Sequence, residues 1–189
     1  MKVVKLGGSL LDDPNALTQC LSAIEKAKEK IVIVPGGGLF ADQVRATQEQ
    51  WNFDEVVAHE MAILAMKQMA LLFNGIKPDF VLAETMPSID QELTRQLVVI
   101  WSPDVKVLAA SKIEASWNVT SDSLAGWLAG QLNATELIVV KSAEIQQNLT
   151  VQQMQDQGLV DKAFSRFTKN TDFNIILINK YRLNEYLLT

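Results

Sequence analysis

Two apolar runs that each end in glycines constrain the fold of this chain more than any other feature. Residues 3–6 form a β-branched run followed by Gly-Gly-Ser at 7–9, and residues 31–34 form a second run followed by Pro-Gly-Gly-Gly at 35–38. A segment with apolar residues at helical spacing lies between them and begins near Pro14. A strand, a helix and a strand in this order predict a parallel unit in which both glycine turns lie at the same edge of a sheet.

The first glycine turn is expected to bind a phosphate group. Its two glycines permit positive φ angles and leave main-chain N–H groups uncovered, and the helix expected after the turn directs the positive end of its dipole at it. Lys5, next to the turn, adds a charge that can follow a phosphoryl group during transfer. An ordinary strand-to-helix connection also uses small residues, and only the second turn makes coincidence a poor explanation.

Composition limits the class of protein and of ligand. A chain of 189 residues with 48% hydrophobic content can bury a substantial core within one domain, 1–189. The net charge of −5 argues against a nucleic-acid partner, so an anionic ligand would need local positive charge. The single cysteine, Cys20, excludes an internal disulfide and a zinc cluster of cysteines. No uninterrupted apolar run approaches eighteen residues and no cleavable leader is apparent, so we expect a cytoplasmic protein without a membrane span.

Strands and helices alternate along the rest of the chain. Helices are expected at 39–44, 53–73, 87–95, 124–129, 151–157 and 181–188, and further strands at 79–83, 97–101, 136–140 and 174–178. Residues 105–108 fit either a short extended piece or a helix. This pattern predicts an α/β fold, a three-layer αβα sandwich with a largely parallel central sheet of about six to eight strands. Neither glycine turn matches a Walker A motif or a dinucleotide-binding motif.

Two further features have both a structural and a functional interpretation. Residues 120–123 read Thr-Ser-Asp-Ser before a helical segment, and any of the four could serve as a plain helix cap. Four in a row exceed that need, and an ionised Asp122 could hold two lysines that neutralise a phosphoryl group. His59 lies among apolar residues of a long helix, where a histidine is usually a packing residue.

Three motifs in this order resemble the amino acid kinase superfamily. They are Lys5-Leu6-Gly7-Gly8-Ser9-Leu10, Pro35-Gly36-Gly37-Gly38 and Thr120-Ser121-Asp122-Ser123-Leu124-Ala125. Within that group the chain is similar to the small aminomethylfuran phosphate kinases of methanofuran biosynthesis. That narrower likeness rests on residues 35–41 with Val44-Arg45, His59 ahead of Ala62-Ile63, Ser116-Trp117, and residues 158–161 with Phe164.

The resemblance implies an ATP-dependent phosphotransferase and a role for each matching residue. Lys5 contacts the transferring phosphoryl group, Asp122 organises the lysines, and Lys141 or Lys162 supplies a second lysine. The remaining implied contacts are Gly7, Gly8, Ser9 and Lys162 to nucleotide phosphates, and Gly36, Gly37, Gly38, Arg45, His59 and Ser121 to the acceptor substrate. Mg²⁺ arrives with ATP and is held chiefly by phosphate oxygens, without a protein metal site. The acceptor is a small anion, with aminomethylfuran phosphate, converted to the diphosphate, as the leading candidate. Relatives commonly form dimers, and Trp51 and Trp127 would suit an interface, although Trp127 fits a core position equally well.

One departure from the family pattern supports a second interpretation. Family members usually follow the fifth strand with Thr-Asp-Val-Asp-Gly, which helps to seat the nucleotide, and here residues 141–145 read Lys-Ser-Ala-Glu-Ile. The alternative is a non-catalytic subunit or ligand-binding protein that keeps the acceptor pocket while its nucleotide site has decayed.

Overall fold

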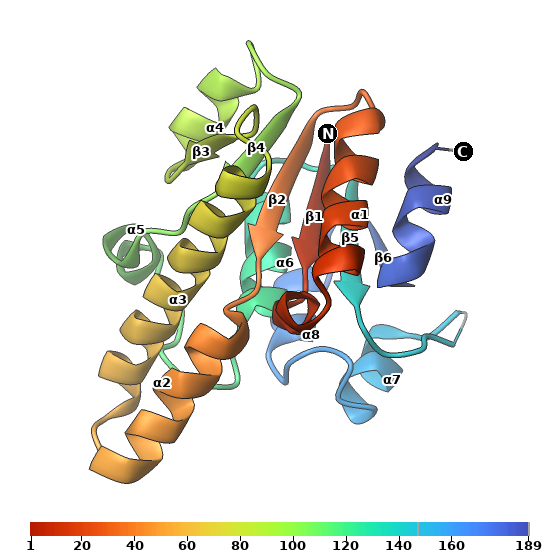
Figure 1. Ribbon diagram of the computed structural model, residues 1–189. Coiled ribbons are helices and arrows are strands. Elements are labelled where there is room, and N and C mark those ends of the chain that lie inside the picture. The colour runs from red at the N-terminus through yellow and green to blue at the C-terminus, as the bar shows by residue number, and fades with distance from the viewer. Residues whose placement is uncertain (147, 189) are drawn as a thin grey trace.

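Six parallel strands form the centre of the molecule, and helices cover both faces of the sheet (Figure 1). The computed structural model describes residues 1–146 and 148–188. The strands are β1 (Lys2–Leu6), β2 (Ile31–Pro35), β3 (Val81–Ala83), β4 (Val98–Trp101), β5 (Glu136–Lys141) and β6 (Asn174–Asn179). Their order is β3-β4-β2-β1-β5-β6, with all neighbours parallel. Because β2 and β5 flank β1 on opposite sides, the carboxyl ends of these three strands form the crevice where open α/β sheets bind ligands.

The helices pack on the sheet as the predicted three-layer sandwich requires. In the described residues they are η1 (Gly8–Asp12), α1 (Pro14–Lys26), α2 (Gly38–Trp51), α3 (Glu55–Ile76), α4 (Met86–Glu92), α5 (Val105–Ala110), α6 (Ser121–Gln131), α7 (Val151–Asp156), α8 (Phe164–Thr168), η2 (Lys180–Arg182) and α9 (Leu183–Leu188), where η marks a 3₁₀ helix. Helices α1 and α9 lie on one face, and α6 and α8 on the other. Figure 1 shows α2 and the adjoining half of α3 projecting beyond the carboxyl ends of the strands.

Alternation along the strands decides which side chains reach the crevice. Val3 and Val139 pack with the core of α6 and α8, whereas Val4 and Val140 pack with the core of α1 and α9. Both sheet faces are therefore buried, which explains why apolar residues follow one another without a break through β2, β4 and the middle of β5. The same alternation puts Lys5 and Lys141 on the α6 face of the sheet.

The structure decides the open assignments of the sequence and corrects one. Residues 105–108 are helical, within α5, because Asp104 caps this segment by accepting from the N–H groups of Lys106 and Val107. The helix predicted from about Pro14 is confirmed, but it does not directly follow the first glycine turn, so its N-terminus does not lie at that turn as expected. The five-residue η1 intervenes, and α1 begins only at Pro14, after its cap Asp13.

Among the described helices, α3 alone is long and apolar enough to be a candidate for a membrane span. It has 22 residues and a mean hydropathy of 1.4 over its most apolar window, so by length and composition it meets the criteria for a membrane span. The prediction without a span considered only uninterrupted apolar runs, and residues such as His59 and Lys67 interrupt this one. In the structure 39% of that window is buried, and Met69, Ala70 and Phe73 belong to the core. Such properties are shared by core helices of soluble proteins, which makes a single helix of this kind weak evidence for a span.

Candidate active site

The two glycine turns are in direct main-chain contact at the carboxyl end of the sheet. A β-carbon on Gly8 would lie 2.4 Å from the nitrogen of Gly38, and one on Gly36 would lie 2.4 Å from the nitrogen of Gly8. Gly36 N–H also donates to the Leu6 carbonyl over 2.8 Å. The prediction that both turns share one sheet edge is therefore confirmed, and the contact leaves no room for side chains between them.

Replacing Gly8 with alanine is expected to push the two turns apart. The new methyl group would meet backbone atoms of Gly38 at 2.4 and 2.6 Å, and backbone cannot swing away as the end of a side chain can. We expect a loss of roughly 1–3 kcal/mol in the free energy of unfolding, as for overpacking of a well-packed core. Denaturant unfolding of Gly8→Ala measures it. Gly130→Ala is the control, because nothing lies within 4 Å of its added β-carbon. Equal stability of the two variants would contradict the packing argument.

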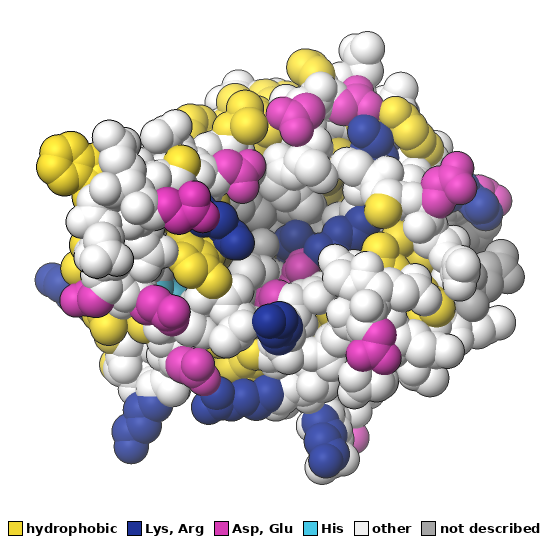
Figure 2. All heavy atoms as spheres, turned by 90° about the horizontal axis from the view of Figure 1, so that it is seen from below, with side chains coloured by type: hydrophobic (Ala, Val, Ile, Leu, Met, Phe, Trp, Pro, Cys, Tyr) yellow, Lys and Arg dark blue, Asp and Glu magenta, His cyan; other side chains and the backbone are white. Residues whose placement is uncertain are grey.

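A cavity of about 340 Å³ opens beside the glycine turns. Its walls come from β1 and η1, from the facing sides of α2 and α3, from the 116–121 segment with the first turn of α6, and from the end of β5. Figure 2 shows the hollowed face, with lysine and arginine side chains gathered in its centre. A protein with a net charge of −5 thus provides the local positive charge that an anionic ligand requires.

Asp122 lies between two lysines at the inner end of the cavity. Its Oδ1 is 2.8 Å from Lys5 Nζ and its Oδ2 is 2.7 Å from Lys141 Nζ. The side chains of Lys5 and Asp122 are only 4% and 7% exposed, and that of Lys141 is 19% exposed. Two ammonium groups and one carboxylate leave a net charge of +1 in a nearly dry site, where it acts strongly on an incoming anion.

Burial and the three charges set the protonation of this group. Burial alone would raise the pKa of Asp122, but Lys5 and Lys141 outweigh it, so the pKa is lowered and the carboxylate stays ionised. Burial and the charge of Lys5 lower the pKa of Lys141 to about 8, against the opposing effects of Asp122 and Asp161. Lys141 therefore loses its positive charge at a pH only slightly above neutral.

The first turn of α6, which carries Asp122, is fixed by a residue from a distant segment. Asp161 Oδ2 accepts from the N–H and the hydroxyl of Thr120, both over 2.8 Å, and from the N–H of Ser123 over 3.0 Å. The Ser123 hydroxyl donates to the other carboxylate oxygen. Thr120 is the N-cap residue but does not cap the helix with its own side chain. Sequence reasoning missed this role of Asp161, since the only signal was its place in a motif that resembles one subgroup.

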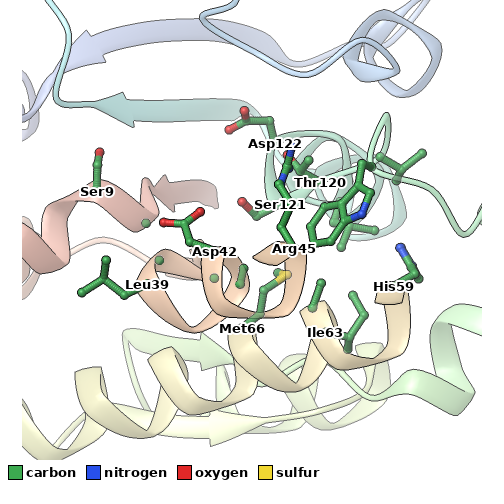
Figure 3. Close-up of a pocket in the computed structure, with 18 of the residues that line it drawn as sticks. Ser9, Leu39, Asp42, Arg45, His59, Ile63, Met66, Thr120, Ser121 and Asp122 are labelled. Carbon is green, nitrogen blue, oxygen red and sulfur yellow. The ribbon is translucent and has the colours of Figure 1, made fainter. Parts of the chain in front are cut away.

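The opposite wall of the cavity carries a cation, an imidazole and apolar side chains (Figure 3). The Arg45 guanidinium stacks 4.3 Å from the centre of the Trp117 ring, and Trp117 Nε1 donates to Gln48 Oε1 over 2.6 Å. Burial lowers the pKa of His59, against a smaller effect of Glu60, so its imidazole is neutral at pH 7. Asp42 shares the α2 face of Arg45 and points toward Ser121 in Figure 3.

Most of the predicted site residues meet in this cavity, and three do not line it. The lining includes Lys5, Gly8, Ser9, Gly37, Gly38, Arg45, His59, Ser121, Asp122 and Lys141. Gly7 and Gly36 do not line the cavity, and each hydrogen-bonds to a strand instead. The Gly7 N–H donates to the Val140 carbonyl over 3.2 Å, and the Gly36 N–H donates to the Leu6 carbonyl over 2.8 Å. Lys162 is exposed and lies outside the lining, so of the two lysines considered as the second phosphate-facing group only Lys141 reaches Asp122.

The reason for glycine in the first turn differs from the prediction. Gly7 has φ −60°, and positive φ among the described glycines is confined to Gly38 and Gly158. The first turn needs glycine for close approach to the second turn. The second turn needs it at Gly38, where φ is +55° and α2 begins.

The N-terminus of α2 opens into the cavity, next to the first turn of α6. Gly37 and Gly38 line the cavity, and no side chain caps α2. The first N–H groups of this 14-residue helix are thus available to an anion. The helix dipole that we expected to point at the first glycine turn is therefore found at the second glycine turn, where α2 begins.

Metal-ligating side chains do not gather in this part of the chain. Within residues 1–146 and 148–188, no three His, Cys, Asp or Glu residues come close enough to hold a metal ion together.

Comparisons with known proteins agree with the geometry. Three solved structures share the fold: uridylate kinase from Archaeoglobus fulgidus (TM-score 0.68, 18% identity, 100% of this chain and 96% of that one), and UMP kinases from Bacillus anthracis and Ureaplasma parvum (each TM-score 0.73, 16% identity, 99% of this chain and 91% of that one). In sequence, an aminomethylfuran methyl phosphate kinase from Methanocaldococcus jannaschii is 32% identical over 146 residues, which is 76% of this chain and 67% of that protein. A model of the amino acid kinase family matches residues 1–144. The chain therefore belongs to the amino acid kinase family.

Proposed function

We propose that this protein transfers the γ-phosphoryl group of ATP to a small phosphate monoester that carries an amine, aminomethylfuran phosphate or a close analogue, and forms a diphosphate. The observation that carries the proposal is the Lys5–Asp122–Lys141 group, which lies beside the two glycine turns in one cavity. Transfer between two anions needs positioned cations and N–H donors around the moving phosphoryl group, and no covalent intermediate on the protein.

Each chain group has a distinct role in the proposed transfer. Lys5 and Lys141 neutralise charge on the moving phosphoryl group, and Asp122 keeps both ammonium groups in place. The first-turn N–H groups beyond Gly7, whose own N–H donates to the Val140 carbonyl, would receive the phosphates of ATP together with Ser9, and Mg²⁺ would be held by those phosphates. The first turn of α2, with Arg45, receives the phosphate of the acceptor.

The walls of the cavity fit an acceptor with a flat apolar body and an ammonium group. Ile63, Met66 and the Trp117 ring supply apolar surface, and the carboxylates of Asp42 and Glu55 face the same space. Neither carboxylate has a hydrogen-bond or ion-pair partner among the described residues, so both are available to a cation. The kinase from M. jannaschii acts on a phosphate with these features, a furan ring and an aminomethyl group.

Calorimetric titration with a non-hydrolysable ATP analogue and Mg²⁺ tests the nucleotide side first. We expect binding in the micromolar to sub-millimolar range, followed by diphosphate formation from ATP and aminomethylfuran phosphate. The analogue without the amine should react with a higher KM, since it leaves Asp42 and Glu55 unpaired.

The alternative, a ligand-binding protein with a decayed nucleotide site, is favoured by one observation, the Lys-Ser-Ala-Glu-Ile sequence at 141–145. Failure to bind the ATP analogue up to several millimolar, with the acceptor still bound, would establish that alternative.

The pH dependence of nucleotide binding follows from Lys141. Its pKa of about 8 means that the Lys5–Asp122–Lys141 group falls from +1 to neutral as the pH rises through that value. We expect affinity for the ATP analogue to fall above about pH 8, and binding near pH 8.5 to take up a proton, because a bound phosphate favours charged Lys141. Calorimetry in two buffers of different ionisation enthalpy measures the uptake. Lys141→Arg should remove it, because a guanidinium stays charged. Affinity that stays constant to pH 10 would contradict the assignment.

We also propose that the protein forms a homodimer through the outer face of α3. Val57, Leu64 and Leu71 follow one another at two-turn spacing and are 44%, 51% and 56% exposed. Trp51, at the end of α2, is 72% exposed and extends this apolar surface. Trp127 does not contribute, since it packs against Trp101 with ring centres 6.1 Å apart.

Sedimentation of two charged variants tests the dimer. Leu64→Lys and Leu71→Lys should convert a dimer to monomer at micromolar concentration, because each places a charge in the apolar stripe. Leu97→Lys is the control, as Leu97 is similarly exposed at 46% but precedes β4, outside α3. A monomeric wild type at tens of micromolar would refute this assembly.

A further inference from the structure

We propose that Asp161 is a positioning residue for phosphoryl transfer: its carboxylate fixes the first turn of α6, and through it holds Asp122 against both lysines. The inference rests on the proposed function and adds a residue that contacts neither lysine.

The hydrogen bonds of Asp161 enclose Asp122 on both sides. Thr120 precedes Asp122 by two residues and Ser123 follows it directly, and each donates both its N–H and its hydroxyl to the Asp161 carboxylate. Charge-assisted bonds of this kind are roughly twice as strong as neutral ones. The backbone at Asp122 is thereby fixed, and with it the direction of a side chain that must reach β1 and β5 together.

Asp161 is itself held rigidly by the segment around it. Gln155 Nε2 donates to the carbonyls of Asp161 and Lys162 over 3.2 and 2.6 Å. Ala163 N–H donates to the Asn118 carbonyl, and the Phe164 side chain that follows is fully buried. Because its backbone is held in this way, the Asp161 carboxylate can fix the position of the first turn of α6. A carboxylate on a mobile surface segment could not do this.

The charge of Asp161 adds a second effect. The charged groups that act on Lys141 are Lys5, Asp122 and Asp161, and of these Asp122 and Asp161 raise its pKa. Removing the charge of Asp161 while keeping its shape should therefore move the titration of Lys141 to lower pH. An uncharged helix cap would have no such influence.

Asp161→Asn tests the proposal with two readouts. Lysine acylation over a pH series, quantified at Lys141 by mass spectrometry, reports its pKa whether or not the protein is a kinase. We expect a fall on the order of 0.5–1 pH unit. Kinetics with the proposed substrates should show kcat reduced on the order of tenfold with little change in KM, since the substituted residue touches neither substrate.

Two further variants separate position from charge. Ser123→Ala removes one hydrogen bond but keeps the Asp161 carboxylate, so kcat should fall while the titration of Lys141 moves less than in Asp161→Asn. Asp104→Asn is the matched cap control, because Asp104 accepts two N–H groups at the start of α5, outside the cavity lining. It should change neither readout.

The outcomes have separate meanings. An unchanged Lys141 titration in Asp161→Asn, with stability lost only as in Asp104→Asn, would reduce Asp161 to a structural cap and overturn the inference. A shifted titration in a protein without kinase activity would refute the proposed function and leave the coupling between Asp161 and Lys141 established.

Discussion

Lys5→Ala is expected to lower kcat on the order of 10³-fold, as removal of a phosphoryl-stabilising cation does in other phosphotransferases. Lys5 is the innermost positive charge of the cavity, 4% exposed and 2.8 Å from Asp122. Without it, the Lys5–Asp122–Lys141 group falls from a net +1 to neutral at pH 7. Initial-rate kinetics with ATP and the acceptor measure the effect.

The same variant should remain folded. Asp122 keeps Lys141 as a partner, so the loss in stability should stay below the roughly 3–5 kcal/mol that breaking a buried ion pair costs when it leaves a charge alone. Lys77→Ala is a matched control, since Lys77 pairs with Glu25 over 2.6 Å outside the cavity. Residual activity within about tenfold of wild type would show that Lys5 does not act on the phosphoryl group.

Asp122→Asn is expected to damage both activity and stability. The amide cannot balance two ammonium groups that lie within 3 Å of the carboxylate in the native protein. We expect a loss of about 3–5 kcal/mol in the free energy of unfolding at pH 7, reduced to the extent that Lys141 releases its proton. Urea unfolding measures it. Asp90→Asn, at an exposed position of α4, is the control and should change little.

The pH dependence of that loss distinguishes electrostatics from packing. A lysine whose pKa is lowered in the folded state binds fewer protons there than in the unfolded state, so stability rises with pH between the folded and unfolded pKa values. For wild-type Lys141 this range begins at about pH 8. In Asp122→Asn it should begin lower, because a group that raised the pKa is gone, and the variant should recover stability as the pH rises. A loss independent of pH would indicate a packing defect.

The architecture of the site could be predicted from sequence because its parts are local. Each glycine turn follows its own strand, and parallel strands place their carboxyl ends together, so the meeting of the turns followed from topology alone. The α6 face of Lys5 and Lys141 follows from strand alternation once the register is known. Which of Lys141 and Lys162 reaches Asp122 could be decided only from the structure, in which the end of β5 places Lys141 beside Asp122.

Contacts between distant segments could not be predicted. Asp161 and the residues it binds are separated by 38 and 41 positions, and residues 120–123 contain enough local capping groups to hide the need for it. The stacking of Arg45 on Trp117 likewise joins α2 to a loop far along the chain. The need for glycine at position 8 could not be predicted for the same reason, since the backbone that it contacts, at Gly38, belongs to another turn.

The backbone contact between the glycine turns has a consequence for the proposed reaction, because the distance between the two phosphates and the choice of acceptor depend on different parts of the site. The spacing of the two proposed phosphate sites is set by main chain against main chain, at Gly8, Gly36 and Gly38, where glycine leaves no side chain between the turns. The proposed acceptor contacts come instead from side chains of α2, α3 and the Ser116–Trp117 loop. If the proposed transfer takes place here, substitutions on these walls can change the acceptor while the backbone contact keeps the distance over which the phosphoryl group moves.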